Sequence, residues 1–207
     1  MYLIILASES PRRKEIMETM GIPYTVITSN VEEVVEETEP EKMVQALAEL
    51  KTSAIEERLE KQEQYGLDFN KEDRIIIGAD TMVFYQEHAL GKPKDTKDAL
   101  RILRMLSGNA HEVITGVSII ICKDGKKEKL SFAVSTKVIV QTLTDQQIVD
   151  YIATGEPMDK AGAYAIQGKF GIFIRKIDGD YYNVMGLPIA KIYSSLLHKD
   201  IDIKKLN

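Results

Sequence analysis

The sequence predicts an α/β protein, because apolar runs typical of buried strands alternate with stretches that carry helix signals. Residues 2–7 read YLIILA and residues 75–77 are three consecutive isoleucines, so both runs favour strands buried on two faces. A long amphipathic helix pattern lies between them. With 207 residues and 44% apolar content, the chain is long enough to bury a real core.

The first predicted strand leads directly into a helix start, where Ser10 is the expected N-cap and Pro11 the first helical residue. Unpaired backbone N–H groups at a helix start attract anions. Four side chains nearby add donors that suit phosphate, namely Ser8, Ser10, Arg12 and Arg13. A capped helix with two solvated arginines explains the segment equally well, so a phosphate site is one of two hypotheses here.

The next part of the chain predicts a strand over residues 22–28, followed by an acidic segment. A long helix begins at Pro40, and its apolar face contains Met43, Val44, Leu47, Leu50 and Ala54. Lys51 lies at the edge of this face, where it either snorkels to solvent or points into a cleft. Residues 56–74 are dense in Glu, Lys and Gln, which indicates an exposed helix end and then a surface loop.

Asp80 is the residue that most needs an explanation. It interrupts an apolar strand predicted over residues 75–85, and burying a lone carboxylate costs several kcal/mol unless a partner compensates. A carboxylate in this position is a metal ligand, a general base, or a cap on a nearby backbone turn.

A turn over residues 86–89 and a polar loop over residues 90–95 follow. Lys92 stands between Gly and Pro in this loop, so it is either a positioned charge or an ordinary turn lysine. A helix is expected over residues 96–107, then two strands joined by a hairpin turn over residues 111–122 and 127–142. A capping box that begins at Thr144 opens another helix.

The glycine-rich segment 156–186 predicts turns around short strands. Gln167 carries an amide that can donate and accept, as base reading requires, although a sheet-edge glutamine bonded to backbone explains it too. Asp178 and Asp180 fit a plain turn better than a metal loop, and a final helix follows Pro188.

Composition excludes several classes of function. A net charge of −5 argues against duplex nucleic acid as a partner. No apolar run approaches the roughly 20 residues of a membrane span, and no signal peptide is evident, so a cytoplasmic location is expected. The lone Cys122 is expected to be a buried, inert thiol, and the three histidines lack ligand spacing.

Eight motifs in order along the chain resemble the Maf family of nucleoside triphosphate pyrophosphatases: LASESPRR, SNVEE, LAELK, IIGADTMV, LGKPKD, LSGNAHEVITGV, EPMDKAGAYAIQG and IDGDYYNVMGLP. The resemblance implies one α/β domain over residues 1–207, with a long bent mixed β-sheet flanked by helices and a central cleft between two lobes. This fold is similar to that of inosine triphosphate pyrophosphatases. It further implies a homodimer, a divalent cation (Mg²⁺ or Mn²⁺), and hydrolysis of a nucleoside triphosphate to the monophosphate and pyrophosphate.

The resemblance also assigns roles to residues. Asp80 matches the family's proton acceptor, and Glu33, together with Asp80, matches the acids that hold the metal. The groups that face phosphate match Ser8, Arg12, Arg13, Lys51 and Lys92, of which the two lysines are expected to assist catalysis. Three marker positions resemble the branch that acts on dTTP and UTP, and they are Arg12, Thr81 and Gln167.

Two other functions remain open from sequence. Maf proteins are associated with inhibition of septum formation, so the chain could be a nucleotide-binding regulator of cell division in which hydrolysis is incidental. A phosphatase that releases single phosphates is the other. Paired acids beside a triphosphate favour an enzyme over a binding regulator, because their repulsion weakens binding unless a metal intervenes. Product analysis separates a pyrophosphatase from a phosphatase.

Overall fold

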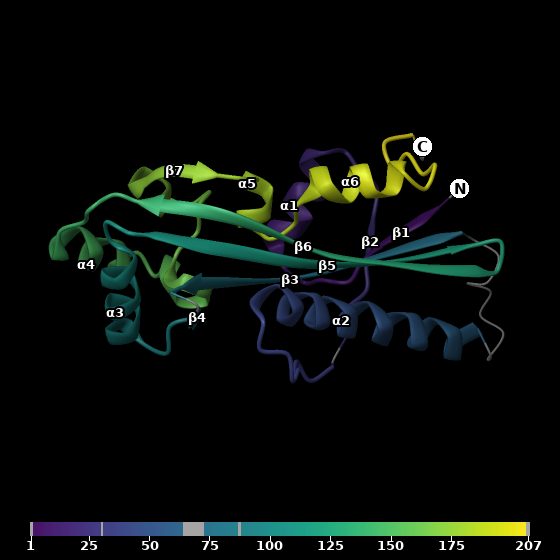
Figure 1. Cartoon of the computed structure of the whole chain (residues 1–207), viewed down its shortest axis with the longest axis horizontal. Coiled ribbons are helices and arrows are strands. Elements are labelled where there is room, and N and C mark those ends of the chain that lie inside the picture. The colour runs from purple at the N-terminus through teal and green to yellow at the C-terminus, as the bar shows by residue number, and fades with distance from the viewer. Residues whose placement is uncertain (1, 30, 64–72, 87, 206–207) are drawn as a thin grey trace. The chain divides into compact units, whose positions relative to one another are not determined.

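The computed structural model describes residues 2–29, 31–63, 73–86 and 88–205. Their strands form one seven-stranded sheet in the order β2-β1-β3-β5-β6-β7, with β4 paired to β3 (Figure 1). The strands are β1 (Leu3–Leu6), β2 (Thr25–Val26), β3 (Arg74–Tyr85), β4 (His88–Leu90), β5 (Ala110–Lys123), β6 (Lys126–Val140) and β7 (Ile174–Asp178). β1 is parallel to β2 and β3, whereas β4 and β7 are antiparallel to β3 and β6. The sheet is therefore mixed, and the predicted α/β class is confirmed.

All of the helices except α5 follow sequence signals. They are α1 (Pro11–Thr19), α2 (Pro40–Glu63), α3 (Thr96–Leu106), α4 (Asp145–Ala153), α5 (Tyr181–Met185) and α6 (Ile189–Leu197). The predicted capping box is present, since the Thr144 hydroxyl accepts from the Gln147 N–H and the Gln147 side chain accepts from the Thr144 N–H. Among the described residues there is no helix with the length and apolar character that crossing a bilayer requires.

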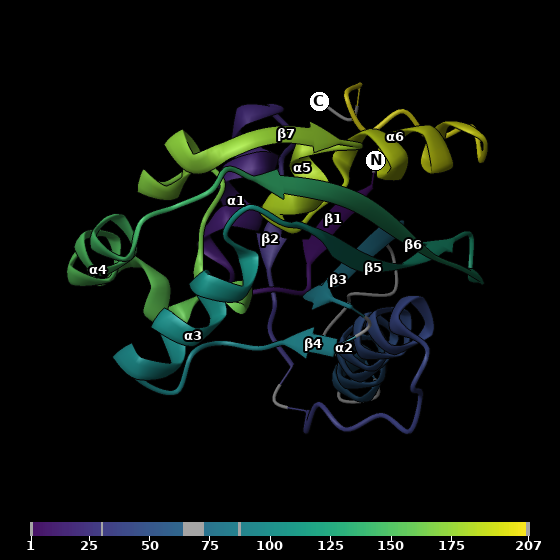
Figure 2. The same cartoon turned by 60° about the vertical axis from the view of Figure 1, so that its left-hand side comes forward.

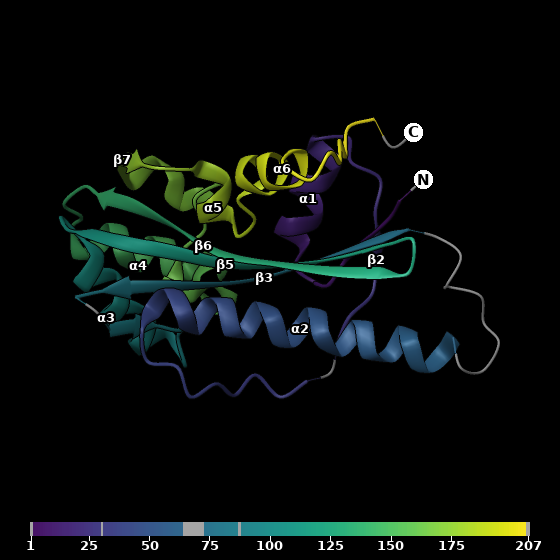
Figure 3. The ribbon, with the colours of Figure 1, turned by 45° about the vertical axis from the view of Figure 1, so that its right-hand side comes forward.

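The chain divides into two compact units. The first comprises the described residues of Met1–Asp80, Gly116–Ala133 and Gly186–Asn207, and the second comprises those of Thr81–Thr115 and Val134–Met185. In the first unit, α2 runs along one face of the sheet while α1 and α6 lie on the opposite face (Figures 1 and 3). In the second unit, α3 packs against α4 (Figure 2).

Two glycines bring α2 unusually close to the sheet in the first unit. A Cβ atom at Gly78 would lie 2.6 Å from Cγ2 of Thr52, and one at Gly116 would lie 2.2 Å from the carbonyl carbon of Val44. The hydroxyls of Thr52 and Ser118 share a buried hydrogen bond of 2.8 Å. Because backbone of the helix meets backbone of the strands here, the position of α2 is tightly constrained.

Three predicted elements differ in the structure. The strand expected over residues 22–28 is confined to Thr25–Val26, because the Ile22 N–H donates to the Met17 carbonyl at the end of α1 and Pro23 has no N–H to donate. Part of the turn expected over residues 86–89 is a strand, since His88 and Ala89 belong to β4 and pair with the end of β3. The segment 156–186, expected to form turns around short strands, forms three 3₁₀ turns, at Glu156–Asp159, Ala161–Ala163 and Lys169–Phe173, the strand β7 and the short helix α5.

The largest correction concerns Glu56, which was expected on an exposed helix end. It is 6% exposed, and its Oε1 lies 3.0 Å from Nη2 of Arg74 and 2.6 Å from Nζ of Lys127. The polar sequence around Glu56 resembles a solvated face because both partners are distant in sequence. The surface loop predicted after it falls largely on residues 64–72, which lie outside the described residues.

Cys122 is buried beside Glu56, as expected of an inert thiol. Burial raises the pKa of its thiol to about 11, so the thiolate that reacts with electrophiles and metals is scarce at neutral pH.

Candidate active site

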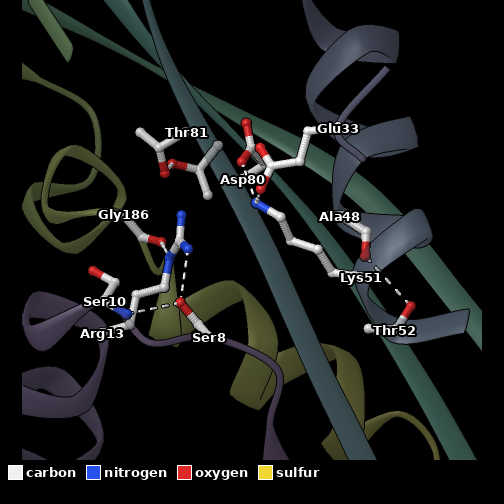
Figure 4. A network of polar contacts seen from close by, with 11 residues as sticks. Ser8, Ser10, Arg13, Glu33, Ala48, Lys51, Thr52, Asp80, Thr81 and Gly186 are labelled. Atoms are coloured by element: carbon white, nitrogen blue, oxygen red, sulfur yellow. Dashed lines mark hydrogen bonds and ion pairs between the residues drawn. The ribbon is translucent and has the colours of Figure 1, made fainter. Parts of the chain in front are cut away.

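The end of β1 and the start of α1 form a compact polar turn. The Oγ atom of Ser8 accepts hydrogen bonds from the Ser10 N–H at 3.2 Å and from Nη1 of Arg13 at 3.0 Å (Figure 4). Ser10 occupies the predicted N-cap position, but its side chain caps none of the described N–H groups of α1. Ser8, rather than Ser10, therefore organises this turn.

Arg13 is not a solvated arginine. It is 9% exposed, and its Nε donates to the carbonyl oxygen of Gly186 at 2.7 Å. Burial lowers the pKa of its guanidinium, and the negative charges of Asp80 and Glu33 act in the opposite direction. Arg13 thus joins the first turn of α1 to a residue 173 positions away in the chain, a contact without a local sequence signal.

A lysine and two carboxylates form a second polar cluster near the turn of Ser8 and Ser10 (Figure 4). Nζ of Lys51, from α2, lies 2.6 Å from Oδ1 of Asp80, on β3, and 3.1 Å from Oε1 of Glu33. The side chains of Lys51 and Asp80 are each 14% exposed, whereas that of Glu33 is 54% exposed. Lys51 therefore points toward the carboxylates instead of snorkelling to solvent, and Asp80 is compensated by an ammonium group and not by a backbone turn.

The same two carboxylates are chemically suited to a divalent cation. Mg²⁺ is commonly bound through one or two carboxylates, with the remaining positions filled by water and substrate phosphates. Glu33 and Asp80 converge on one point, where Lys51 Nζ contacts an oxygen of each. Within the described ranges no group of three or more His, Cys, Asp or Glu side chains is arranged to hold a metal, so a fully protein-built cage is not what this site offers.

Other candidates belong to the second unit. Thr81 directly follows Asp80 on β3, and its hydroxyl lies 2.9 Å from that of Thr115 on β5. Lys92 is exposed in the loop between β4 and α3. Gln167 is exposed in a turn and is not on a sheet edge, so the alternative explanation offered by the sequence is wrong.

Glu156 braces the turn that carries Gln167. Its Oε1 accepts from the Tyr151 hydroxyl at 2.9 Å, and its Oε2 accepts from the Lys169 N–H at 3.0 Å. A Cβ atom at Gly168 would lie only 2.3 Å from Glu156 Oε1, so the turn packs directly on this carboxylate. The sequence gives no local signal for this role.

The interpretation of Asp178 and Asp180 as a plain turn is confirmed. Oδ1 of Asp180 accepts from the Tyr182 N–H at 2.8 Å at the start of α5, and Gly179 between them has a φ of +134°. This Asp side chain serves a local backbone contact.

A comparison with protein families finds that the model of the Maf-like proteins matches residues 3–199. The chain belongs to the Maf family. The resemblance drawn from the eight motifs is confirmed, and it extends over nearly the whole chain.

Curated Maf relatives are similar along their full length. The chain is 47% identical over 206 residues to a "dTTP/UTP pyrophosphatase" of Lachnoclostridium phytofermentans, with 99% of each chain covered. It is 47% identical over 204 residues to the protein of that name in Alkaliphilus metalliredigens and 44% identical over 201 residues to that of Bacillus cereus strain B4264, with 98% and 97% of each chain covered.

Proposed function

We propose that this protein hydrolyses dTTP and UTP to the nucleoside monophosphate and pyrophosphate. The observation that carries the proposal is the cluster beside the buried Arg13, in which Nζ of Lys51 lies 2.6 Å from an oxygen of Asp80 and 3.1 Å from an oxygen of Glu33. The full-length relatives of this chain have the activity in their names.

Asp80 is the proposed acceptor of the proton from the attacking water. Lys51 donates to its Oδ1 at 2.6 Å, which fixes the orientation of the carboxylate. The two oxygens of Asp80 would divide the tasks, one accepting the proton and the other facing the metal. General base catalysis of this kind contributes about 10²–10⁴-fold to a rate.

The triphosphate is expected to lie against the cationic groups. The polar turn of Ser8, Ser10 and Arg12 presents hydroxyls and a guanidinium, and Arg13 holds that turn in place through its bonds to Ser8 and Gly186. Lys51 and Lys92 are the proposed ammonium contacts. Glu33 and Asp80 would hold the Mg²⁺ or Mn²⁺ ion, which when bound neutralises charge on the triphosphate oxygens.

Thr81 and Gln167, together with Arg12, are the residues proposed to select the base. We expect a homodimer, as the resemblance implies. A regulator that only binds nucleotide is less favoured, because two carboxylates within 3.1 Å of the Lys51 ammonium offset much of the positive charge that would attract a triphosphate.

The test is Asp80→Asn, which keeps the shape of the side chain and removes its charge. Turnover of dTTP and UTP in the presence of Mg²⁺ or Mn²⁺ should fall about 10²-fold or more, and the wild-type product should be pyrophosphate, distinguished from orthophosphate by chromatography. Asp178→Asn is the matched control, since Asp178 is a carboxylate with a side chain 67% exposed; it should keep full activity. Full turnover by Asp80→Asn would show that the assigned role is wrong, and orthophosphate as the first product would favour the phosphatase.

A further inference from the structure

The ammonium group of Lys51 contacts one oxygen of each carboxylate that is proposed to hold the metal (Figure 4). Its Nζ lies 2.6 Å from Oδ1 of Asp80 and 3.1 Å from Oε1 of Glu33. The side chains of Lys51 and Asp80 are each 14% exposed, so little water is at hand to replace either partner. Lys51 is therefore the counter-ion of this pair of acids, and a divalent cation has to compete with it for the same oxygens.

Packing beside Lys51 keeps this contact in place. Thr52, the next residue on α2, is 0% exposed, and its hydroxyl shares a hydrogen bond of 2.8 Å with that of Ser118. A Cβ atom at Gly78, two residues before Asp80 on β3, would lie only 2.6 Å from Cγ2 of Thr52. The backbones that carry Lys51 and Asp80 are thus held at a fixed separation, and only the flexible end of the lysine side chain can change partner.

The charges around the two acids also oppose the binding of a free divalent cation. Arg13 is 9% exposed, and the charges of Asp80 and Glu33 act on its guanidinium, as does that of Arg12. Together with Lys51, three cationic side chains therefore accompany two carboxylates. This excess of positive charge repels a free Mg²⁺ or Mn²⁺ ion, whereas the complex of that ion with a nucleoside triphosphate is an anion and is attracted.

Two carboxylates are also too few ligands to hold a free ion firmly. Mg²⁺ requires an octahedral set of ligands and usually takes most of them from water and substrate phosphates. Over the ranges that the structure describes, no third His, Cys, Asp or Glu side chain completes a metal site. A triphosphate supplies the further oxygens that the ion needs, and it also offers Lys51 another anionic partner.

We propose that Lys51 is a resident counter-ion that keeps free divalent cations away from Glu33 and Asp80 until a triphosphate releases it, so that the substrate is the preformed complex of metal and nucleotide. The inference rests on the proposed function, in which the two acids hold the metal and Lys51 contacts the triphosphate. Lys51 leaves the carboxylates as it takes a phosphate oxygen, so neither charge is left without a partner. Metal and nucleotide then increase each other's affinity for the protein.

The experiment measures the binding of Mn²⁺ alone, in the absence of nucleotide, to the wild type, Lys51→Met and Lys51→Arg. Electron paramagnetic resonance of the unbound ion gives each dissociation constant. Met keeps the apolar stem of lysine without its charge, so Mn²⁺ should bind Lys51→Met about tenfold more tightly or better. Lys51→Arg retains a cation and should stay within about threefold of the wild type. A purely structural role for Lys51 predicts the opposite sign in Lys51→Met, because loosened carboxylates bind metal more weakly.

Lys199→Met is the matched control for the loss of one positive charge. Lys199 follows α6 in the same unit and pairs with Glu128 of β6, and its side chain is 37% exposed. Its removal should change the affinity for Mn²⁺ by less than about twofold, because solvent and salt screen an exposed charge. Equal tightening in Lys199→Met and Lys51→Met would mean that net charge alone is responsible, which overturns the inference.

Two further measurements cover the case in which Lys51→Met does not fold. Lys51→Gln has no charge but can still donate to one carboxylate oxygen, and it should also bind Mn²⁺ more tightly than the wild type. In the wild type itself, calorimetry should show that Mn²⁺ alone binds about tenfold more weakly or worse than its preformed complex with the α,β-methylene analogue of UTP, whose carbon bridge resists hydrolysis. Equal affinities for the free ion and for the complex would contradict the inference.

The outcomes separate this inference from the proposed function. Unchanged or weaker binding of Mn²⁺ to folded Lys51→Met or Lys51→Gln overturns the inference, even where the wild type releases pyrophosphate from dTTP and UTP. A wild-type protein that releases no pyrophosphate overturns the proposed function, whereas the affinity for Mn²⁺ alone is measured without any turnover.

Discussion

Gly116→Ala is the sharpest test of how the site is held, because the structure leaves no room for the added carbon. The new Cβ would lie 2.2 Å from the carbonyl carbon and oxygen of Val44 and 2.4 Å from the backbone nitrogen of Gln45. An ordinary contact begins at 3.4 Å, so this turn of α2 must retreat by about 1.2 Å, the difference between 3.4 and 2.2 Å. Backbone cannot rotate out of the way as a side chain can, and overpacking of this kind costs about 1–3 kcal/mol.

The retreat of α2 also reaches catalysis, because Lys51 lies two turns further along the same helix. A shift of about 1 Å in a reacting constellation can cost about 10²-fold in rate, so we expect kcat to fall while the protein stays folded. The assays are turnover of dTTP and thermal unfolding, where about 1 kcal/mol corresponds to roughly 2–4 °C in a chain of this size.

Gly91→Ala is the matched control for this experiment, since a Cβ at Gly91 meets nothing within 4 Å. Its unfolding free energy should stay within about 0.5 kcal/mol of the wild type. If Gly116→Ala melted like Gly91→Ala and retained full turnover, the close approach of α2 to the sheet would not be what positions Lys51.

Two further predictions concern stability and pH. Burial opposes ionisation of Glu56, but hydrogen bonds from Arg74 and Lys127 outweigh this effect and lower the pKa of its carboxyl group. Glu56→Gln should therefore lower the free energy of unfolding by about 3 kcal/mol near pH 7. In urea titrations, the difference from the wild type should shrink as the pH falls below about 4.5, through the lowered pKa of the native protein. Burial lowers the pKa of His111 from 6.5 to about 4, so the unfolded chain binds a proton that the native protein does not, and stability should fall by up to about 3 kcal/mol between pH 6.5 and 4. His111→Gln removes this titration, and an equally steep loss of stability in that variant over the same pH range would contradict the assignment to His111.

The sequence predicted well wherever the signal was local. The capping box at Thr144 depends on residues three apart, and the run of isoleucines in β3 reports burial directly. Asp80 was identified because a carboxylate inside an apolar strand needs a partner, which is also a local inconsistency. In each case the deciding physics lies within one element.

The predictions that were open or wrong concern contacts between residues that are distant in sequence. The sequence left Lys51 between solvent and a cleft, and its partner Asp80 is 29 positions away. It placed Glu56 on an exposed helix end because Arg74 and Lys127 join it only in the folded protein. A local sequence pattern predicts a charged residue to be solvated when its counter-charge is distant in sequence. Long-range ion pairs therefore could not be predicted from such patterns.

The charges around the polar turn also separate an enzyme from a simple binding protein. Two cations of α1, Arg12 and Arg13, and one of α2, Lys51, accompany the carboxylates Glu33 and Asp80, so most of the positive charge that could attract a triphosphate is offset. A protein selected only to bind nucleotide gains affinity when these acids are lost, because each opposes the phosphates. In Asp80→Asn, we therefore expect affinity for dTTP measured by calorimetry without divalent cation to be equal to or higher than that of the wild type, even as turnover falls. Weaker binding in that variant without divalent cation would mean that Asp80 serves to hold the nucleotide, contrary to the role proposed for it.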